Sequence, residues 1–508
     1  MNGTSRGTLI ALACCLFFCA AGVVFAPLLG IENDESLFGS VLYGPAEPNT
    51  IHFAGHRLPL MLMSYLGALK GWLYWPVFAL WAPNAYSIRL PAVVAGAATV
   101  WLFFLLMRRI AGERAAVISA VLLAADSLFF LTTVYDWGPV ALQHLLNVGA
   151  LLALARFVER ERSGDLALAF FLFGLALWDK AVFVWILVAL AAAVLASFPR
   201  EARRLFSRQR ATIAAGAMMC GGLPLLVYNL NHSFATAHQD SAFAPQDVPA
   251  KFQFLIDSFR GGLFEFLTPP EGPWPVASFL GVLLALSLAL WPRVWKWKRS
   301  AGRWMWCGFV FLAVGWLQMA VTRYAGTSVH HTILLWPIPV LIVAVALSAL
   351  PARALSSAIV AVVAAHNVFV LYTYRTDLRE QGSTPVWTEG VYDLARLTQP
   401  MPTQYFVMDW GMLENLVLLR QGQLALHAAW QPLIHASLTE AEKADVREWI
   451  ARPTSVFLAH LRGTEIFKGC RENLDGVARE AGYRQEMLAV IKDAHGKAVF
   501  EAFRFVRE

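Results

Sequence analysis

Two carboxylates, Asp34 and Glu35, directly follow the first long apolar segment of the chain. A carboxylate held where lipid meets water can act as a general base, because it can take the proton from a hydroxyl or amine as that group attacks an activated carbon. The alternative is structural, since the same stretch can be a hydrated loop in which Glu35 caps a helix. Charge alone leaves both interpretations open.

Two adjacent histidines, His330 and His331, raise the hypothesis of a metal site. Neighbouring side chains on a helix point about 100° apart, so one ion would not naturally be held by both. We therefore expect no metal here, and interface packing is one alternative for the pair. The sequence indicates no cofactor, and no motif supports a divalent cation.

The composition is that of a membrane protein. Of 508 residues, 58% are hydrophobic and only 15% are charged, whereas soluble proteins carry about 25% charged residues. The net charge of +6 does not indicate nucleic-acid binding, because the basic residues form short clusters between apolar segments, as the positive-inside rule requires. We expect the first apolar segment to be a retained span and not a cleaved signal peptide.

Eleven apolar segments predict membrane-spanning helices, since a span needs about 20 apolar residues and fewer where it is packed inside protein. Only Asp179 and Lys180 separate two of them, which predicts a continuous buried hairpin with charges at its tip. The predicted spans are 8–29, 86–107, 115–133, 138–156, 166–178, 181–198, 211–230, 274–292, 304–322, 331–350 and 354–374.

The connections between the spans predict a topology. If the spans alternate, the basic clusters near Arg108, Arg156, Arg200, Arg293 and Arg353 all fall on one side. This side should be cytoplasmic. The acidic pair, the turn at 135–139 and Lys180 then lie on the outward side, together with everything after the last span.

Two outward regions have structure of their own. Within the first outward loop, 30–85, an amphipathic stretch from His56 to Trp72 predicts one or two helices lying in the interface plane. The region 375–508 predicts a small α/β domain. Its expected elements are strands at 405–408 and 455–458, a helix at 438–450 with Thr439 and Glu442 as a capping box, and a hairpin of 486–492 with 498–506.

The fold class that follows is an all-α polytopic membrane domain, 1–374, with a small C-terminal α/β extracytoplasmic domain, 375–508. Short motifs in the first part resemble those of GT-C membrane glycosyltransferases, in particular the group of protein O-mannosyltransferases (glycosyltransferase family 39-like) and the bacterial transferase that adds aminoarabinose to lipid A. The motifs are Asp34-Glu35-x-x-Phe38-Gly39, His56-x-x-Pro59-Leu60, Arg89-Leu90-Pro91 and Gly174-Leu175-Ala176-x-x-x-Lys180.

The resemblance implies an inverting transfer of a sugar from a polyprenyl-phosphate donor, with Asp34 as the general base. Inversion is a single in-line displacement, so one base suffices. The leaving group is a lipid phosphate, and cations must stabilise its developing charge. The candidates on the outward side are Lys180, Arg323, His330, His331, Arg57 and Lys70. For Lys180, a salt bridge with Asp179 or snorkelling to the interface is the structural alternative.

Asp136 lies in the outward turn Tyr135–Pro139. The GT-C relatives have an acidic residue near this point, often after an Arg-Tyr pair, and here Val134-Tyr135 stands in its place. The resemblance implies that Asp136 orients the acceptor together with Glu35, or supports the site. The alternative is that it caps the helix that follows.

The expected partners are the polyprenyl-phosphate sugar, membrane lipids and a protein, lipid or glycan acceptor, without nucleic acid. The expected location is the bacterial inner membrane, with the C-terminal domain in the periplasm. A polytopic transporter or flippase is the competing hypothesis. It predicts inverted repeats and polar residues at the midplane, whereas the sequence shows no internal repeat and gathers its polar candidates on one side.

Overall fold

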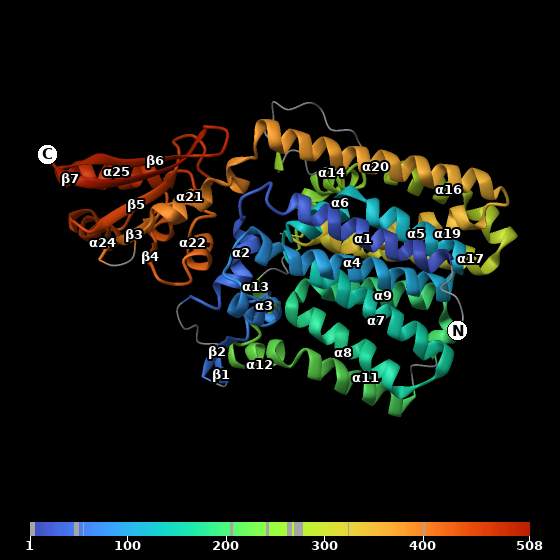
Figure 1. Cartoon of the computed structure of the whole chain (residues 1–508). Coiled ribbons are helices and arrows are strands. Elements are labelled where there is room, and N and C mark those ends of the chain that lie inside the picture. Colours follow the sequence, from blue (N-terminus) through green and yellow to red (C-terminus); the bar gives the residue numbers. More distant parts are fainter. Residues whose placement is uncertain are drawn as a thin grey trace.

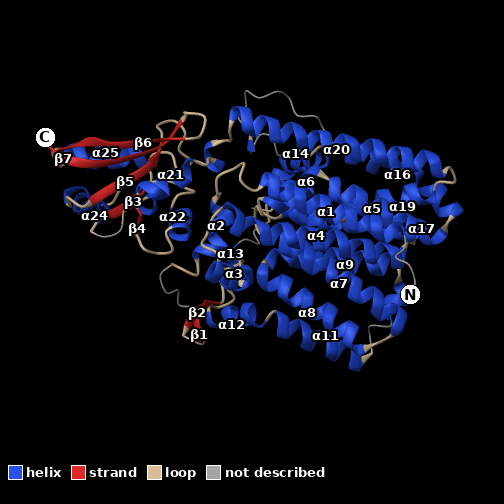
Figure 2. Ribbon diagram, in the orientation of Figure 1, coloured by secondary structure: helices blue, strands red, loops and turns tan. Residues whose placement is uncertain are grey.

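A bundle of apolar helices makes up most of the molecule, and a small sheet follows it at the C-terminal end (Figures 1 and 2). The computed structural model describes residues 6–44, 50–53, 55–203, 207–239, 243–261, 267–268, 278–323, 325–399 and 402–508. The N-terminus of the chain lies at the end of the bundle remote from the sheet, as Figure 1 shows.

All eleven predicted spans fall on helices, although the span 274–292 begins outside the described residues. Five helices are long and apolar enough to cross a membrane, and three bent pairs bring the number to eight. The remaining three predicted spans lie on α8, α9 and α16. The segments in chain order are α1 (Arg6–Phe25), α4 (Ala85–Ile110), α5 (Glu113–Ala125) with α6 (Ser127–Val134), α7 (Val140–Arg160), α8 (Ser163–Asp179), η1 (Ala181–Phe183) with α9 (Val184–Ser197), α11 (Arg208–Gly221) with α12 (Leu223–Asn231), α16 (Leu280–Trp297), α17 (Arg299–Val321), α18 (Val329–Thr332) with η3 (Ile333–Leu335) and α19 (Ile338–Ala349), and α20 (Arg353–Gln381).

Each bent pair has a local cause. Between α5 and α6 the helix bends by 57° at Asp126, whose carboxylate accepts a hydrogen bond from Phe129 N (2.7 Å) and so caps the second half. Gly222 separates α11 from α12. Pro337 precedes α19, where a proline cannot continue the helical hydrogen bonding. Breaks at membrane depth are tolerated because the freed backbone groups find partners inside the protein.

Small residues let α8 and α11 approach closely. A Cβ added at Gly174 would lie 2.2 Å from Met218 O, and one at Gly221 would lie 2.3 Å from Phe171 O. Two glycines facing each other allow the backbones to touch, as is common between membrane helices. This contact explains the glycine in the Gly174-Leu175-Ala176 motif.

The predicted hairpin of 166–178 with 181–198 is wrong. α8 packs against α7 and α11, whereas α9 packs against α17. The chain reverses direction here without bringing the two helices together, because Lys180 is extended and pairs with the first outward loop. Gly67 N donates to Asp179 O (3.1 Å) and Ala181 N donates to Tyr65 O (2.9 Å).

Salt bridges gather the basic connections at one end of the bundle. Arg210 pairs with Glu161 (2.7 Å) and Arg303 pairs with Glu201 (3.3 Å). Arg109, at the end of α4, pairs with Glu159 at the end of α7. These contacts join successive connections that the alternating topology places on one side, so the structure agrees with that topology.

The first outward loop differs from the prediction between His56 and Trp72. This stretch begins as strand β2 (His56–Pro59), which forms a hairpin with β1 (Thr50–Phe53). Two helices flank the hairpin, α2 (Asn33–Ser40) and α3 (Leu69–Leu80). They lie at the end of the bundle that faces the C-terminal region (Figure 1).

The C-terminal region is the predicted α/β domain. Its five-stranded sheet has the order β4-β3-β5-β7-β6, with the first three strands parallel and the hairpin of β6 and β7 antiparallel. The predicted capping box of Thr439 and Glu442 is present. The elements are α21 (Gly390–Leu397), β3 (Gln404–Val407), α22 (Leu413–Leu419), β4 (Ala425–Ala428), α24 (Glu440–Ala451), β5 (Ser455–His460), α25 (Cys470–Glu480), β6 (Tyr483–Lys492) and β7 (Ala498–Arg507).

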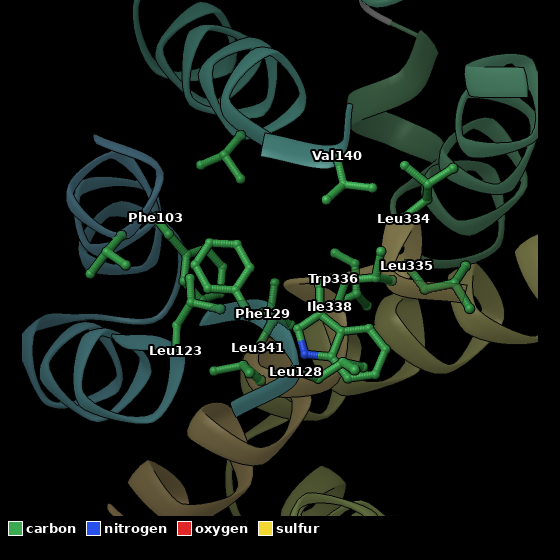
Figure 3. Packing of buried hydrophobic residues seen from close by; sticks show 14 of the residues in the cluster. Phe103, Leu123, Leu128, Phe129, Val140, Leu334, Leu335, Trp336, Ile338 and Leu341 are labelled. Atoms are coloured by element: carbon green, nitrogen blue, oxygen red, sulfur yellow. The ribbon is translucent and has the colours of Figure 1, made fainter. Parts of the chain in front are cut away.

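The core of the bundle is a continuous aromatic and aliphatic cluster. Figure 3 shows Phe103, Phe129, Trp336 and Leu341 among the packed side chains of this cluster. They come from α4, α6, the segment before α19, and α19 itself. Because this packing fixes the helices relative to one another, the ends of these helices can hold polar side chains in fixed positions.

The C-terminal region docks directly onto the junction of α1 and α2. Gly30 N donates to Trp387 O (2.7 Å), and Asn415 Nδ2 of α22 donates to Ile31 O (2.7 Å). A Cβ at Gly30 would lie 1.9 Å from Thr388 O, so only glycine permits this approach.

Replacing Gly30 by alanine should force the two parts of the chain apart there, at a cost of about 1–3 kcal/mol. Hydrogen exchange measured on peptides that cover Gly30 and Trp387 should become faster. The control is Gly164→Ala, at a position where an added Cβ meets nothing within 4 Å. Equal protection in Gly30→Ala and the wild type would contradict the docking.

Candidate active site

Four chain segments meet at the end of the bundle that faces the C-terminal region. They are the start of α2, the start of α3, the turn between α6 and α7, and the residues that join α8 to η1. Each brings charged side chains, and these side chains are close enough for their charges to act on one another.

A buried ion pair between Arg89 and Glu35 holds the first of these segments. Both side chains are fully buried, and the contacts are bidentate at 2.6 and 2.7 Å. Arg89 also donates to the carbonyl oxygens of Ala26 (2.5 Å), Leu29 (2.8 Å) and Gly30 (2.6 Å). One guanidinium therefore satisfies three carbonyl groups of the segment that joins α1 to α2, and fixes the start of α2.

Glu35 is thus fully engaged. Burial raises the pKa of its carboxyl, and the Arg89 charge opposes that rise. The alternative that Glu35 is a helix cap in a hydrated loop is wrong. Glu32 is the N-cap of α2, because its carboxylate accepts from Asp34 N (2.7 Å).

A second buried ion pair joins α3 to the turn before α7. Lys70 Nζ lies 2.5 Å from Asp136 Oδ2, and both side chains are almost fully buried. The other carboxylate oxygen, Oδ1, accepts from Ala141 N (3.0 Å) in the first turn of α7. Asp136 therefore satisfies one free N–H at the start of α7, although Pro139 and not Asp136 is the N-cap residue, and it also ties Lys70 to that helix.

Lys180 lies beside this pair. Its Nζ donates to Gly138 O (3.1 Å), in the turn that contains Asp136. Burial lowers the pKa of Lys180 to about 8, and the carboxylates of Asp34, Asp179 and Asp136 oppose the decrease. Asp179 itself accepts from Gln143 Nε2 (2.7 Å), so it is held by an amide and not by the predicted salt bridge with its neighbour.

Asp34 differs from the other acids of this cluster. It is only partly buried, whereas Glu35, Asp136 and Asp179 have at most 2% of their surface exposed. No hydrogen bond joins its carboxylate to a described residue. Burial raises the pKa of Asp34, and the charges of Lys180 and Lys70 act in the opposite direction.

The two histidines lie next to the same turn. The His330 ring lies 5.1 Å from the Trp137 ring, and its Nδ1 lies 2.9 Å from Ser328 Oγ. The rings of His330 and His331 are 4.2 Å apart at 62°. His331 Nδ1 is buried with no hydrogen-bond partner in the described part of the chain, and the same is true of Asp179 Oδ1.

The remaining predicted cations are placed differently. Arg57 is on the exposed hairpin, and its Nη2 donates to Gly44 O (2.8 Å). Arg323 is exposed, and its carbonyl oxygen lies 3.4 Å from Lys251 Nζ. No contact between described side chains joins Arg57 to the cluster. Both residues stay predictions as phosphate ligands.

Among the described residues, one group has the spacing of metal ligands. Glu389, Asp493 and His495 bring one ligand atom each to within 4.8 Å of one another. They lie where α21 begins and where β6 turns into β7, outside the charged cluster.

Sequence reasoning missed several members of the site. Arg89 was noted only as part of a motif, although a charge inside an apolar segment signals a buried partner. The C-terminal region also contributes, and the sequence offered only the loop Asp409-Trp410-Gly411 after a strand as a sign of this, for which a plain turn was the alternative. Trp410 lies beside the Glu32 carboxylate, and the charge of Asp34 acts on Glu414.

Comparison with solved structures identifies the fold that positions this site. The chain matches ArnT from Cupriavidus metallidurans bound to undecaprenyl phosphate with a TM-score of 0.60 at 13% identity, over 97% of each chain. It matches apo ArnT with 0.58 at 15%, over 96% of this chain and 97% of that one. The apo oligosaccharyltransferase of Archaeoglobus fulgidus matches with 0.50 at 13%, over 96% of this chain and 70% of that one. The chain is therefore an integral membrane protein with the GT-C fold of membrane glycosyltransferases.

Within that class, residues 68–228 match the family model described as dolichyl-phosphate-mannose-protein mannosyltransferase. This match and the structural ones confirm the resemblance predicted from the motifs. A search of curated proteins finds no match.

Replacing Arg89 by methionine should leave Glu35 buried and unpaired, at a cost of about 3–5 kcal/mol. Thermal unfolding of the purified protein in detergent measures the loss. Adding Glu35→Gln should recover part of it, because a neutral amide tolerates burial better than a carboxylate. Arg210→Met breaks an exposed pair and should cost less than about 1 kcal/mol. Equal effects of Arg89→Met and Arg210→Met would contradict the role of the buried pair.

Proposed function

We propose that this protein transfers a sugar from a polyprenyl-phosphate donor to an acceptor on the outward face of the membrane, with inversion and with Asp34 as the general base. The observation that carries the proposal is a difference in burial and hydrogen bonding between the carboxylates of one cluster. Asp34 is the partly exposed carboxylate without a hydrogen bond to a described residue, beside acids that are buried and held.

In the proposed reaction, the acceptor hydroxyl or amine attacks the anomeric carbon as Asp34 takes its proton. The bond from that carbon to the phosphate oxygen breaks on the opposite side, and the polyprenyl phosphate leaves with the electron pair. One displacement requires one base, and no sugar–enzyme bond forms. The raised pKa of Asp34 favours proton transfer to it, as a base needs.

Glu35 and Asp136 cannot share this role in the same way, because Arg89 engages both oxygens of Glu35 and Lys70 pairs with Asp136. We assign them to positioning. Glu35 sets the start of α2 and hence the place of Asp34, and Asp136 sets the turn that holds Lys180. Both residues then influence the orientation of the acceptor indirectly, through the positions of Asp34 and Lys180.

For the donor phosphate, we propose Lys180 as the principal cation, with His330 and His331 beside it. The described residues supply one hydrogen-bond acceptor to its ammonium, Gly138 O, which leaves donors for a phosphate. Buried polar atoms without partners are rare, and His331 Nδ1, which lies near Lys180, can donate to a phosphate oxygen when it carries the proton. The solved ArnT structure with undecaprenyl phosphate supports this donor class.

We also propose that the basic end of the bundle is cytoplasmic in a bacterial inner membrane, so that the cluster and the C-terminal domain lie in the periplasm. We propose a membrane domain of residues 1–374 and a C-terminal domain of residues 375–508. Helix α20 crosses this boundary, because it continues to Gln381. Because the charged cluster lies at one end of the bundle, this arrangement favours the transferase over a transporter, which would place its binding site near the midplane.

Replacing Asp34 by asparagine should lower the transfer rate by about 10²–10⁴-fold, because the amide cannot accept the proton. The assay is transfer in membranes from a panel of polyprenyl-phosphate sugars. Asp393→Asn, an exposed carboxylate on α21, is the control and should leave the rate unchanged. Undiminished activity of Asp34→Asn would refute the assigned base.

Binding of undecaprenyl phosphate should weaken as the pH rises through about 8. A pKa lowered to about 8 means that Lys180 loses its proton there, and the neutral amine no longer attracts the phosphate. The affinity should fall by at most about tenfold for each pH unit above the pKa. Lys180→Arg should bind without this decrease, because arginine stays charged. The same pH profile in both proteins would exclude Lys180 as the phosphate ligand.

The topology predicts opposite outcomes for two reporter positions. Alkaline phosphatase fused after Glu508 should be active in a bacterial host, since the enzyme folds in the periplasm, and a fluorescent protein fused at the same point should be dark. Fusions after Arg160, in the basic connection between α7 and α8, should give the reverse. Activity of the phosphatase after Arg160 would invert the proposed orientation.

A further inference from the structure

An apolar cavity of about 370 Å³ lies at the end of the bundle opposite the charged cluster. It is formed by α4, α7, α9, α17 and α19, near the ends that carry the basic connections. Its walls include Leu154, Ala155, Ala193, Trp304, Phe311 and Leu341. Leu341 is also labelled in Figure 3, within the hydrophobic core. None of the residues assigned to the candidate active site lines this cavity.

The helix packing explains why space remains here. α4 packs against α7 on one side, and α9 packs against α17, which packs against α19, on the other. Between these groups some of the facing residues are small, in particular Ala155 of α7 and Ala193 of α9. Small side chains on two facing helix groups leave a volume that the protein itself does not fill.

The side chains that line the cavity suit neither bound water nor an empty space. A buried water needs two to four polar partners, and the interior of the cavity offers aliphatic and aromatic side chains instead. An empty space of this size forfeits dispersion contacts on every wall. In a protein that lies in a bilayer, the abundant apolar occupant is a hydrocarbon chain.

The rim of the cavity is charged. Arg109 and Glu159 form a partly exposed ion pair there, and Glu201, which pairs with Arg303, also lies on the rim. Side chains of Arg109 and Arg303 are 26% and 31% exposed, so both guanidinium groups can reach a phosphate at the membrane surface. Arginines at this depth are typical ligands for anionic head groups.

We propose that this cavity is a binding site for one phospholipid of the leaflet at the basic end of the bundle. One acyl chain occupies the cavity between the two helix groups, and the phosphate of the head group lies against Arg109 and Arg303. The site is separate from the proposed donor site, because the donor phosphate belongs with Lys180 at the other end. The inference therefore stands whether or not the proposed transfer reaction is correct.

The test is native mass spectrometry of the full chain, extracted in a mild detergent from bacterial membranes. We expect the wild type to retain one phospholipid. Ala193→Phe fills the cavity with a ring and should lower the occupancy about tenfold or more. Ala191→Phe, on the exposed face of the same helix, should retain the lipid. Ala155→Phe fills the cavity from α7 and replaces Ala193→Phe if that variant is not monodisperse.

A second measurement identifies which kind of lipid supplies the hydrocarbon chain in the cavity. Phosphatidylglycerol added to delipidated wild type should raise its unfolding temperature, and the shift should be absent in Ala193→Phe and kept in Ala191→Phe. Inorganic phosphate should give no shift. Loss of all phospholipid from the wild type, or equal occupancy in the two variants, would overturn the proposal. A shift with undecaprenyl phosphate alone that Ala193→Phe removes would also overturn it, since the occupant would then be an isoprenoid chain.

Discussion

The buried ion pair of Arg89 with Glu35 is the interaction on which the rest of the outward end depends. Taking two charges out of water costs several kcal/mol, and the attraction compensates only with good geometry and further hydrogen bonds. Here the geometry is bidentate, and three carbonyl oxygens of the segment that joins α1 to α2 take the remaining donors of the guanidinium. The pair therefore joins α1, α2 and α4 at one point. This contact sets the direction of α2 and hence the position of Asp34.

The cluster shows how environment can give chemically similar groups different tasks. Glu35 and Asp136 each have a buried cation as partner, and each joins two chain segments. Asp34 has no such partner and keeps contact with solvent, while it remains within the field of Lys180 and Lys70. Only a carboxylate with a free lone pair and access from solvent can accept a proton from an incoming group. Burial and ion pairing, and not residue type, therefore distinguish Asp34 from Glu35 and Asp136.

The two ends of the bundle hold their charged side chains in different ways. At the basic end, the cations form exposed pairs that cost little to maintain. At the outward end, every cation of the cluster is buried and needs a specific acceptor. The C-terminal domain takes part in this arrangement, because Asn415 donates to Ile31 O in the segment before α2. The active site that we propose is therefore shared by residues more than 300 positions apart in the chain, as the separation of 384 between Asn415 and Ile31 shows.

The sequence alone determined the features that depend on neighbours along the chain. Hydropathy and length located the eleven helical segments, and the capping box of Thr439 and the β6–β7 hairpin follow from short patterns. The partners of the charged residues depended on the tertiary structure, since Arg89 meets Glu35 across 54 residues and a periodic pattern contains no such information. The same limit explains the two wrong predictions. The residues between α8 and α9 pair with the distant strand-like segment at Tyr65 and Leu66, and the stretch from His56 pairs with β1, so in both places a long-range backbone contact replaced the locally expected form.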